Sequence, residues 1–196
     1  MINFKTARFV ISAPAYQLAP QPKLPEILVV GKSNVGKSSL LNALCDNRNL
    51  AFTSSKPGHT RLLNFYDVEG KFYLVDAPGY GYSAAGKGHL EKFSEMMEGY
   101  FGVPNLLKGV LYLLDSRHAP TQDDKDFYDF VKQNHIPMVL VMTKVDKLNQ
   151  SEKAKIPANL KVAFGEALAI NPLLTSAEKG IGMDKLRAQI DSFLRN

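Results

Sequence analysis

The sequence predicts a three-layer α/β/α fold around a six-stranded, mostly parallel β-sheet with one antiparallel strand. Short apolar runs of strand length, bounded by turn residues, alternate along the chain with segments of helical periodicity. Buried strands that alternate with helices are typical of a parallel sheet covered on both faces. A Glu69–Gly70 turn joins the second and third runs as a hairpin, and this hairpin supplies the antiparallel strand.

The predicted elements follow in a regular order. We expect strands at residues 26–31, 62–68, 71–77, 109–115, 138–144 and 171–177, and helices at 37–45, 89–101, 121–134, 151–168 and 183–194. Thr121, followed three residues later by Asp124, resembles a capping box at the start of the third helix. The connections at about residues 46 to 60 and 77 to 89 are long for a compact fold, and such loops are often functional.

Length and composition predict one domain. With 196 residues, 45% of them hydrophobic and 22% charged, the chain is ordinary for a soluble domain. No apolar run approaches the roughly 20 residues that span a bilayer. We expect residues 24–196 to form the domain and residues 1–23 to form an arm packed on it. The arm carries basic residues and no acid, as transit peptides do, but its "ARFVISAP" is more typical of a strand.

The single cysteine and the net charge indicate the cellular setting. Cys45 cannot close an intrachain disulfide and falls in the apolar stripe of the first predicted helix, so we expect it in the core of a protein from a reducing compartment. The formal charge of +5 would favour association with polyanions such as RNA or an acidic membrane. Ordinary surface lysines explain that charge equally well.

The stretch "GKSNVGKS" matches the phosphate-binding pattern G-x-x-x-x-G-K-[ST] and lies between a predicted strand and a predicted helix. Its glycines let backbone N–H groups approach phosphate oxygens, and the helix N-terminus adds partial positive charge. Lys37 would reach the β- and γ-phosphates, and Ser38 would offer its hydroxyl to Mg²⁺. The fold is therefore predicted to be of the P-loop NTPase type, with nucleotide contacts from Gly31, Lys32, Ser33, Asn34, Val35, Gly36, Lys37, Ser38 and Ser39. The alternative is a glycine-rich turn with a solvent-facing lysine.

A second motif indicates which base is bound. "TKVD", made of Thr143, Lys144, Val145 and Asp146, ends a predicted strand at the edge of the sheet where open α/β folds bind ligands. Asp146 could accept hydrogen bonds from N1–H and the exocyclic amine of guanine, a pair that adenine cannot provide. "TSA", made of Thr175, Ser176 and Ala177, offers backbone N–H groups for the guanine oxygen. Without the P-loop, "TKVD" would be read as a surface turn.

Together these motifs resemble the translation-factor-type GTPases, with five ordered elements: "GKSNVGKS", Thr60 in "KPGHTRLLNF", "DAPG", "TKVD" and "TSA". More narrowly, the sequence is similar to the EngB (YihA/YsxC) family, within the group of TrmE, Era, EngA, EngB and septin-like GTPases. That similarity rests on "FVISAP", "KPGHTRLLNFY", "DAPGYGYS" and "LLDSRHAPTQDD" and covers almost the whole chain. It implies hydrolysis of GTP to GDP and phosphate.

The resemblance also implies roles for individual residues. Ser38 and Thr60 would be Mg²⁺ ligands, and Asp76 would hold a metal-bound water. Lys37, Thr60 and Gly79 would be catalytic, with the Gly79 N–H contacting the γ-phosphate. Asn34 matches a position at which some relatives bind K⁺, and Thr143 stands where many GTPases have Asn. Further nucleotide contacts would come from Gly58, His59, Arg61, Leu62, Ala77 and Pro78.

The family resemblance further implies partners and a biological role. The protein would act in assembly of the large ribosomal subunit, in contact with its rRNA and proteins, and would be needed for normal cell division and septation. It would be a monomer in the bacterial cytoplasm. The basic residues Arg8, Lys185, Arg187 and Arg195 are compatible with rRNA contact and equally with a solvated surface. "DSRHAPTQDD" is either a partner loop or a helix cap in which Arg117 pairs with Asp123 or Asp124.

Tyr80 bears on the rate of the expected reaction. It follows the "DAPG" glycine, where signalling GTPases have the glutamine that orients the attacking water. An aromatic side chain cannot take over that role, so we expect slow intrinsic turnover that a ribosomal partner or K⁺ accelerates. Two alternatives stay open: a nucleotide-gated binding module for division proteins with incidental hydrolysis, and a P-loop small-molecule kinase. The kinase would leave "TKVD" unexplained.

Overall fold

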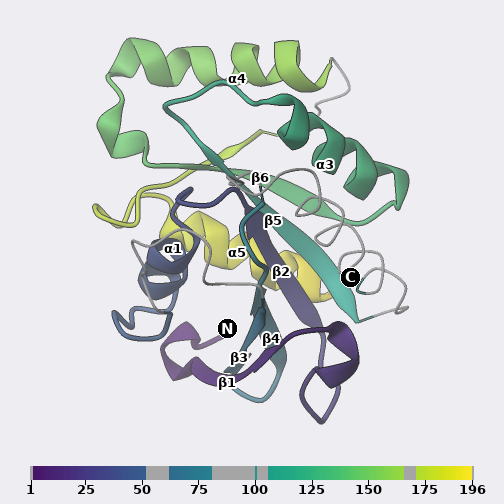
Figure 1. Ribbon diagram of the computed structural model, residues 1–196. Coiled ribbons are helices and arrows are strands. Elements are labelled where there is room, and N and C mark those ends of the chain that lie inside the picture. The colour runs from purple at the N-terminus through teal and green to yellow at the C-terminus, as the bar shows by residue number, and fades with distance from the viewer. Residues whose placement is uncertain (1, 52–61, 81–99, 101–105, 166–170, 196) are drawn as a thin grey trace.

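The computed structural model describes residues 2–51, 62–80, 100, 106–165 and 171–195, and Figure 1 shows their arrangement around one twisted sheet. The strands lie in the order β1-β3-β4-β2-β5-β6-β7. Their bounds are β1 Arg8–Ala13, β2 Glu26–Gly31, β3 Leu63–Val68, β4 Phe72–Asp76, β5 Leu107–Asp115, β6 Met138–Thr143 and β7 Leu173–Leu174. The α-helices are α1 Lys37–Leu44, α3 Gln122–Gln133, α4 Gln150–Phe164 and α5 Met183–Arg195, and short 3₁₀ turns lie at Phe4–Thr6, Tyr16–Leu18 and Val145–Lys147.

The predicted fold class is confirmed, with one more strand than expected. Residues of the arm form β1, which pairs antiparallel with β3 from Arg8↔Asp67 to Ala13↔Leu63. The β3–β4 hairpin leaves one side of β3 open, and the β-branched run in "RFVISA" is suited to fill it. β3 is also antiparallel to β4, and β4 is parallel to β2. Among the strands that the structure describes, β3 is therefore the one that runs opposite to the others.

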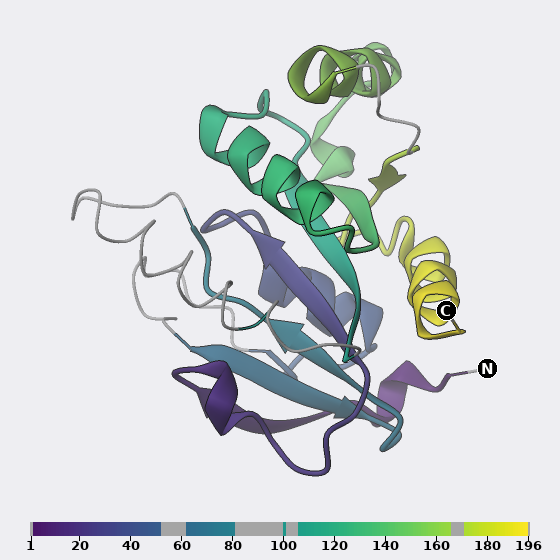
Figure 2. The ribbon, with the colours of Figure 1, turned by 90° about the vertical axis from the view of Figure 1, so that its right-hand side faces the viewer.

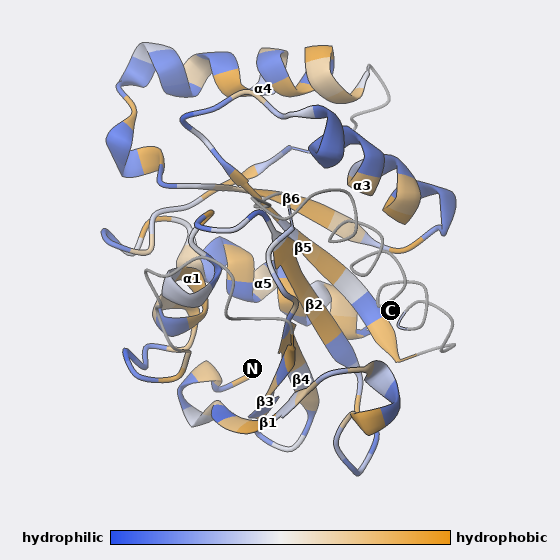
Figure 3. Cartoon of the chain, viewed as in Figure 1, coloured by the Kyte–Doolittle hydropathy of each residue, from blue (hydrophilic) through white to orange (hydrophobic). Residues whose placement is uncertain are grey.

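Two hydrophobic cores lie on opposite faces of the sheet. Side chains of α1 and α5 pack with Ile27 and Val29 on one face, while α3 and α4 pack with Leu28 and Val30 on the other. Figure 2 shows α3 and α4 on one side of β5 and α5 on the other. Figure 3 shows the apolar colour concentrated on the central strands and the polar colour on the outer helices. Burial on both faces is why these strands read as unbroken apolar runs.

Several local predictions hold. Cys45 is fully buried, and burial raises the pKa of its thiol to about 12. Glu69 and Gly70 both have positive φ, as a tight hairpin turn requires. The Asp124 carboxylate accepts a hydrogen bond from the Thr121 backbone N–H at 2.7 Å, so the capping box at α3 is present. The helix expected at 89–101 lies outside the described residues except for Tyr100.

The N-terminal segment contributes to both cores. Phe4 and Ala7 are buried on the α1–α5 face, and Ala13, Tyr16 and Ala19 are buried on the other. Among the described residues, none of the helices combines the length and the apolarity needed to cross a membrane.

The fold gathers the motifs at one edge. In a parallel sheet the carboxyl ends of the strands lie on the same side, and ligands of open α/β folds bind there. The segments that follow β2, β4, β5, β6 and β7 are those of "GKSNVGKS", "DAPG", "DSRHAPT", "TKVD" and "TSA". Residues separated by more than a hundred positions in the chain therefore become neighbours.

Candidate nucleotide site

The phosphate loop joins β2 to α1 with a backbone that needs glycine. Gly36 precedes the first residue of α1 and has φ of 106°, in the region that favours glycine. At Gly31 a Cβ would lie 2.8 Å from the Leu113 carbonyl oxygen, so no side chain fits between β2 and β5 there. The loop is thus held close to the sheet at Gly31.

Lys37 lies at the first position of α1, with Nζ 3.5 Å from the Gly31 carbonyl oxygen. Its ammonium therefore folds back across the loop that it follows. Burial lowers the pKa of Lys37 below its ordinary value, and the carboxylate of Asp76 opposes that shift. A phosphate oxygen would stabilise this partly desolvated charge.

Asp76 ends β4 and faces the phosphate loop. Burial raises the pKa of Asp76 to about 6, although Lys37 and a hydrogen bond from Asn64 oppose the shift. Its Oδ1 is buried and has no hydrogen-bond partner among the described residues. An unpartnered buried carboxylate oxygen is costly, and a cation-bound water would supply the missing donor. The donor set of this carboxylate and the Ser38 hydroxyl, all oxygen, fits Mg²⁺.

The "DAPG" segment lies directly against the phosphate loop. The Ser33 backbone N–H donates to the Tyr80 carbonyl oxygen at 3.2 Å. A Cβ at Gly79 would lie 2.8 Å from both the nitrogen and Oγ of Ser33, so only glycine fits. Ala77 donates to the Val29 carbonyl oxygen at 3.0 Å, and Pro78 is buried.

Part of the predicted site falls on residues that the structure does not describe. Gly58, His59, Thr60 and Arg61 lie outside the described residues, so their predicted contacts stay predictions. Leu62 immediately precedes β3 and is partly buried, while Ser39 is exposed on α1.

Two residues of "TKVD" tie the predicted base loop to the phosphate loop. Thr143 Oγ1 donates to the Val35 carbonyl oxygen at 2.7 Å, and Thr143 is 4% exposed. Lys144, with φ of 59°, donates through Nζ to the Asn34 carbonyl oxygen at 2.7 Å. Thr143, where many GTPases have Asn, therefore still supports the loop through its side chain.

Asp146 and "TSA" meet as the sequence predicts. The Val145 N–H donates to the Thr175 carbonyl oxygen at 3.2 Å, and Ala177 follows Ser176. A hydrogen bond from Ser176 holds the pKa of Asp146 below its ordinary value, with help from Lys147 at 3.1 Å. Asp146 is therefore ionised at neutral pH and acts only as an acceptor, as recognition of the guanine N1–H and amine requires.

Sequence reasoning missed Asp115. This residue ends β5 and binds Arg117 through two hydrogen bonds of 2.9 and 2.7 Å, and Lys144 Nζ at 2.9 Å. The alternative that Arg117 pairs with Asp123 or Asp124 was wrong, because Asp115 is two residues away and presents both oxygens to the guanidinium. The available signal was its place at the end of β5, in register with Thr143 on β6.

We expect Asp115→Asn to lower the free energy of unfolding at pH 7 by about 1–2 kcal/mol. Burial opposes ionisation of Asp115, but hydrogen bonds from Arg117 and Lys144 outweigh it and lower its pKa below the ordinary 3.8. Its stabilisation is thus present above that pH and is lost as the pH falls. Urea unfolding should show the two proteins converging towards pH 2. A difference that stays constant with pH, or that Asp129→Asn on the exposed face of α3 reproduces, contradicts this.

The basic residues considered for rRNA contact differ in their surroundings. Arg187 donates to the Leu44 carbonyl oxygen at 2.8 Å, which caps the end of α1. Arg8 pairs with Asp67 at 2.7 Å, and Arg195 pairs with Asp191. Lys185 is exposed on α5. Three of these four residues therefore have structural partners of their own.

Comparison with known proteins places the chain in a family. The family model described as "50S ribosome-binding GTPase" matches residues 26–144. A protein of Oceanobacillus iheyensis named "Probable GTP-binding protein EngB" is 42% identical over 96% of this chain and 97% of its own length. The protein of the same name from Geobacillus thermodenitrificans is 42% identical, over 98% of this chain and 99% of its own.

Solved structures show the same fold. The crystal structure of "a probable GTP-binding protein engB" superposes with a TM-score of 0.72, over 87% of this chain and 98% of that one, at 22% identity. The family match and the near full-length relatives agree with the phosphate and base motifs brought together at the sheet edge. The chain therefore belongs to the EngB family of GTP-binding proteins and is a GTP-hydrolysing enzyme.

Proposed function

We propose that this GTPase acts as a switch in assembly of the large ribosomal subunit and is thereby needed for normal division and septation in the bacterial cytoplasm. One observation supports the role as a switch. The Ser33 N–H donates a hydrogen bond to the carbonyl of Tyr80, so the phosphate loop directly contacts the segment that senses the γ-phosphate in related GTPases. The ribosomal partner is supported by the family model, whose description names 50S binding. We also propose that residues 24–196 are one GTP-binding domain, with residues 1–23 as an arm packed on it.

In this proposal, guanine binds Asp146 with support from the 143–146 and 175–177 segments, and the phosphates bind residues 31–39. Mg²⁺ would be held by Ser38 and Thr60 directly and by Asp76 through water, and it would neutralise charge on the β- and γ-phosphates. The buried, unpartnered Oδ1 of Asp76 supports that assignment. Asn34 is exposed on the loop, where K⁺ could join it beside the phosphates.

Catalysis would be electrostatic. The Lys37 ammonium and the loop N–H groups stabilise negative charge on the transferring phosphoryl group, and the Gly79 N–H contacts its oxygens. Tyr80 is 3% exposed and its hydroxyl lies in the core. The group that orients the attacking water therefore comes from elsewhere, and a partner or a bound ion is the simplest source.

The partner is tested by co-sedimentation with purified 50S and 30S subunits in the presence of a non-hydrolysable GTP analogue, GDP or an ATP analogue. We expect binding to 50S with the GTP analogue, weaker binding with GDP, and no effect of the ATP analogue. Binding that ignores the nucleotide, or that is absent from both subunits, contradicts the ribosomal role and leaves division proteins as the partner to test.

The source of activation gives a kinetic prediction. We expect fewer than about one turnover per second in Na⁺ buffer without a partner, because the residue in the position of the water-orienting glutamine is Tyr80, whose hydroxyl is buried against Tyr112 and Asp124. Addition of 50S subunits or replacement of Na⁺ by K⁺ should raise the rate, and a group supplied in trans can contribute about 10³- to 10⁵-fold. Multiple-turnover phosphate release measures this. Many turnovers per second in Na⁺ alone would show that the chain carries its own activating group.

A further inference from the structure

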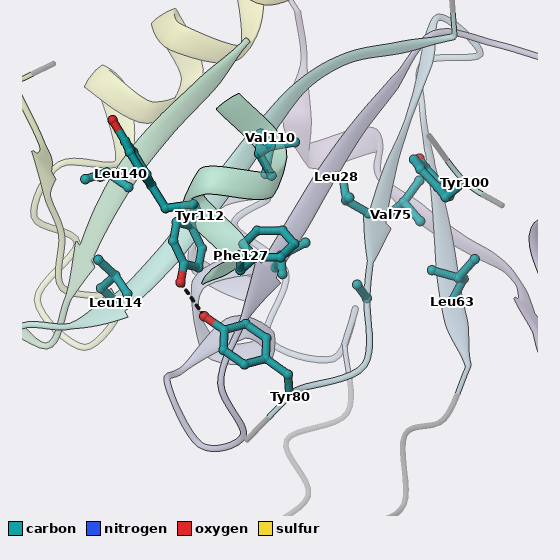
Figure 4. Close-up of a cluster of buried hydrophobic side chains, with 14 of the residues drawn as sticks. Leu28, Leu63, Val75, Tyr80, Tyr100, Val110, Tyr112, Leu114, Phe127 and Leu140 are labelled. Atoms are coloured by element: carbon teal, nitrogen blue, oxygen red, sulfur yellow. Dashed lines mark hydrogen bonds between the residues drawn. The ribbon is translucent and has the colours of Figure 1, made fainter. Parts of the chain in front are cut away.

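The side chain of Tyr80 is buried in a polar network between β4, β5 and α3. Its Oη lies 2.5 Å from Tyr112 Oη and 2.8 Å from Asp124 Oδ1. Figure 4 shows the two phenols pointing at each other, with Phe127 beside them. The Tyr80 ring stacks on Phe127 at 5.8 Å between centroids, with 25° between the ring planes. Ring and hydroxyl of Tyr80 are therefore both held in place.

The hydrogen-bond network ends at the Asp124 carboxylate, which accepts from several donors. Asp124 Oδ2 accepts from the Thr121 N–H at 2.7 Å and lies 3.1 Å from Lys32 Nζ. Burial opposes ionisation, but the hydrogen bonds from Thr121, Tyr80 and Lys32 outweigh it and lower the pKa of Asp124. Tyr80 Oη donates to the carboxylate, and Tyr112 Oη, which lies 2.9 Å from the Asp124 carbonyl oxygen, can donate to that oxygen or to Tyr80, so the three residues form one hydrogen-bonded chain. Lys32 links this chain to the phosphate loop.

The backbone of Tyr80 binds the same loop. Its carbonyl accepts from Ser33, and Lys32 and Tyr80 form a parallel bridge. A Cβ added to Gly79 would collide with Ser33. Gly79 is therefore held between two fixed groups, the end of β4 before it and the side chain of Tyr80 after it.

We propose that Tyr80 is a positioning residue: through Tyr112 and Asp124 it holds Gly79 against the phosphate loop, and so sets the selectivity for GTP over GDP. This inference rests on the proposed contact of the Gly79 N–H with the γ-phosphate. GDP has no γ-phosphate, so its binding does not depend on where Gly79 lies. The Tyr80 hydroxyl would then affect the affinity for GTP without contacting the nucleotide.

Removing the Tyr80 hydroxyl should weaken the contacts that hold Gly79 in place without leaving a large cavity in the core. Tyr80→Phe keeps the ring and its stacking on Phe127 but loses the hydrogen bonds to Tyr112 and Asp124. Only the part of this loss that moves Gly79 reaches the γ-phosphate contact, so we expect a change in affinity of the order of one hydrogen bond, about five- to tenfold. A merely structural role would change both nucleotide affinities or neither.

The experiment measures the affinities of GDP and a non-hydrolysable GTP analogue for the full chain by calorimetry. We expect Tyr80→Phe to weaken the analogue about five- to tenfold and leave GDP within about twofold. Tyr112→Phe should act in the same direction, and the double variant should lose less than the sum of the two. Tyr128→Phe is the matched control. Tyr128 lies on α3 and is buried, as Tyr80 is, but its ring packs against Phe164.

Other outcomes overturn the proposal. An unchanged ratio of the two affinities in Tyr80→Phe, a ratio that shifts towards the GTP analogue, or equal effects of Tyr128→Phe each contradict it. Gly79→Ala, whose new methyl must displace the segment from Ser33, tests the underlying assumption. If Gly79→Ala weakens the analogue and Tyr80→Phe does not, the positioning role alone fails. If Gly79→Ala has no effect, the γ-phosphate contact in the proposed function fails, and the present inference fails with it.

Discussion

Asp146→Asn is expected to lower the affinity for GTP and GDP by about four to five decades and to raise that for xanthine nucleotides. The carboxylate accepts from two guanine donors, whereas the amide of asparagine presents one donor group that guanine cannot pair. Xanthine carries a carbonyl where guanine carries its amine, so it can accept from that group. Calorimetric titration with GDP and XDP measures both changes.

The surroundings of Asp146 make this change a test of the base rather than of folding. Its side chain is 8% exposed and its neighbour Lys147 has a second partner in Glu178, at 2.9 Å. The loop is also held by Thr143 and Lys144, which the substitution leaves intact. Asp129→Asn makes the same change on the exposed face of α3 and should bind GTP normally. Retained GTP affinity in Asp146→Asn would remove the guanine assignment.

Lys37→Ala is expected to lower the single-turnover rate of GTP hydrolysis by about 10²–10³-fold. The ammonium is partly desolvated beside Gly31 and Asp76, so it would interact strongly with charge that develops on the phosphoryl oxygens. Its removal also takes away the positive charge that opposes the raised pKa of Asp76. Quench-flow at saturating GTP measures the chemical step apart from nucleotide affinity.

A matched control separates catalysis from net charge. Lys71→Ala removes the same charge from the exposed β3–β4 hairpin, where Lys71 pairs with Glu69 at 3.1 Å, and it should hydrolyse GTP at the normal rate. GDP affinity in Lys37→Ala should fall much less than the rate, because the transition state carries more charge towards Lys37 than the product does. A rate within twofold of the parent protein would exclude Lys37 from catalysis.

The sequence predicted most reliably where the signal is local. The phosphate loop needs glycines and a lysine at fixed spacing between a strand and a helix, and the structure has that strand, loop and helix at 26–44. The capping box at Thr121 depends on residues three apart and is present. The strand count was one too low because pairing of β1 with β3 depends on a free edge about 55 residues further along the chain.

Long-range polar pairs were the least predictable. One of the two readings of "DSRHAPTQDD" paired Arg117 with Asp123 or Asp124, but in the structure Arg117 pairs with Asp115, which also binds Lys144. Asp124 was considered as a helix cap and as a partner of Arg117, whereas its carboxylate also accepts a hydrogen bond from Tyr80. In both cases one carboxylate bonds to residues of two elements, and the sequence pattern indicates only the partner that is nearer in the chain.

By itself, the sequence determined the class of chemistry, GTP binding and hydrolysis on a phosphate loop, and it predicts guanine recognition by Asp146 and a water-orienting group other than Tyr80. These are matters of residue type and short spacing. Only the tertiary structure decided how the motifs cooperate, through Thr143 and Lys144 on the phosphate loop and through Tyr80 on Asp124. Those bonds join residues that lie far apart in sequence, 108 positions for Thr143 and Val35 and 44 for Tyr80 and Asp124. Such partners meet because the parallel strands of the sheet place their carboxyl ends at one edge.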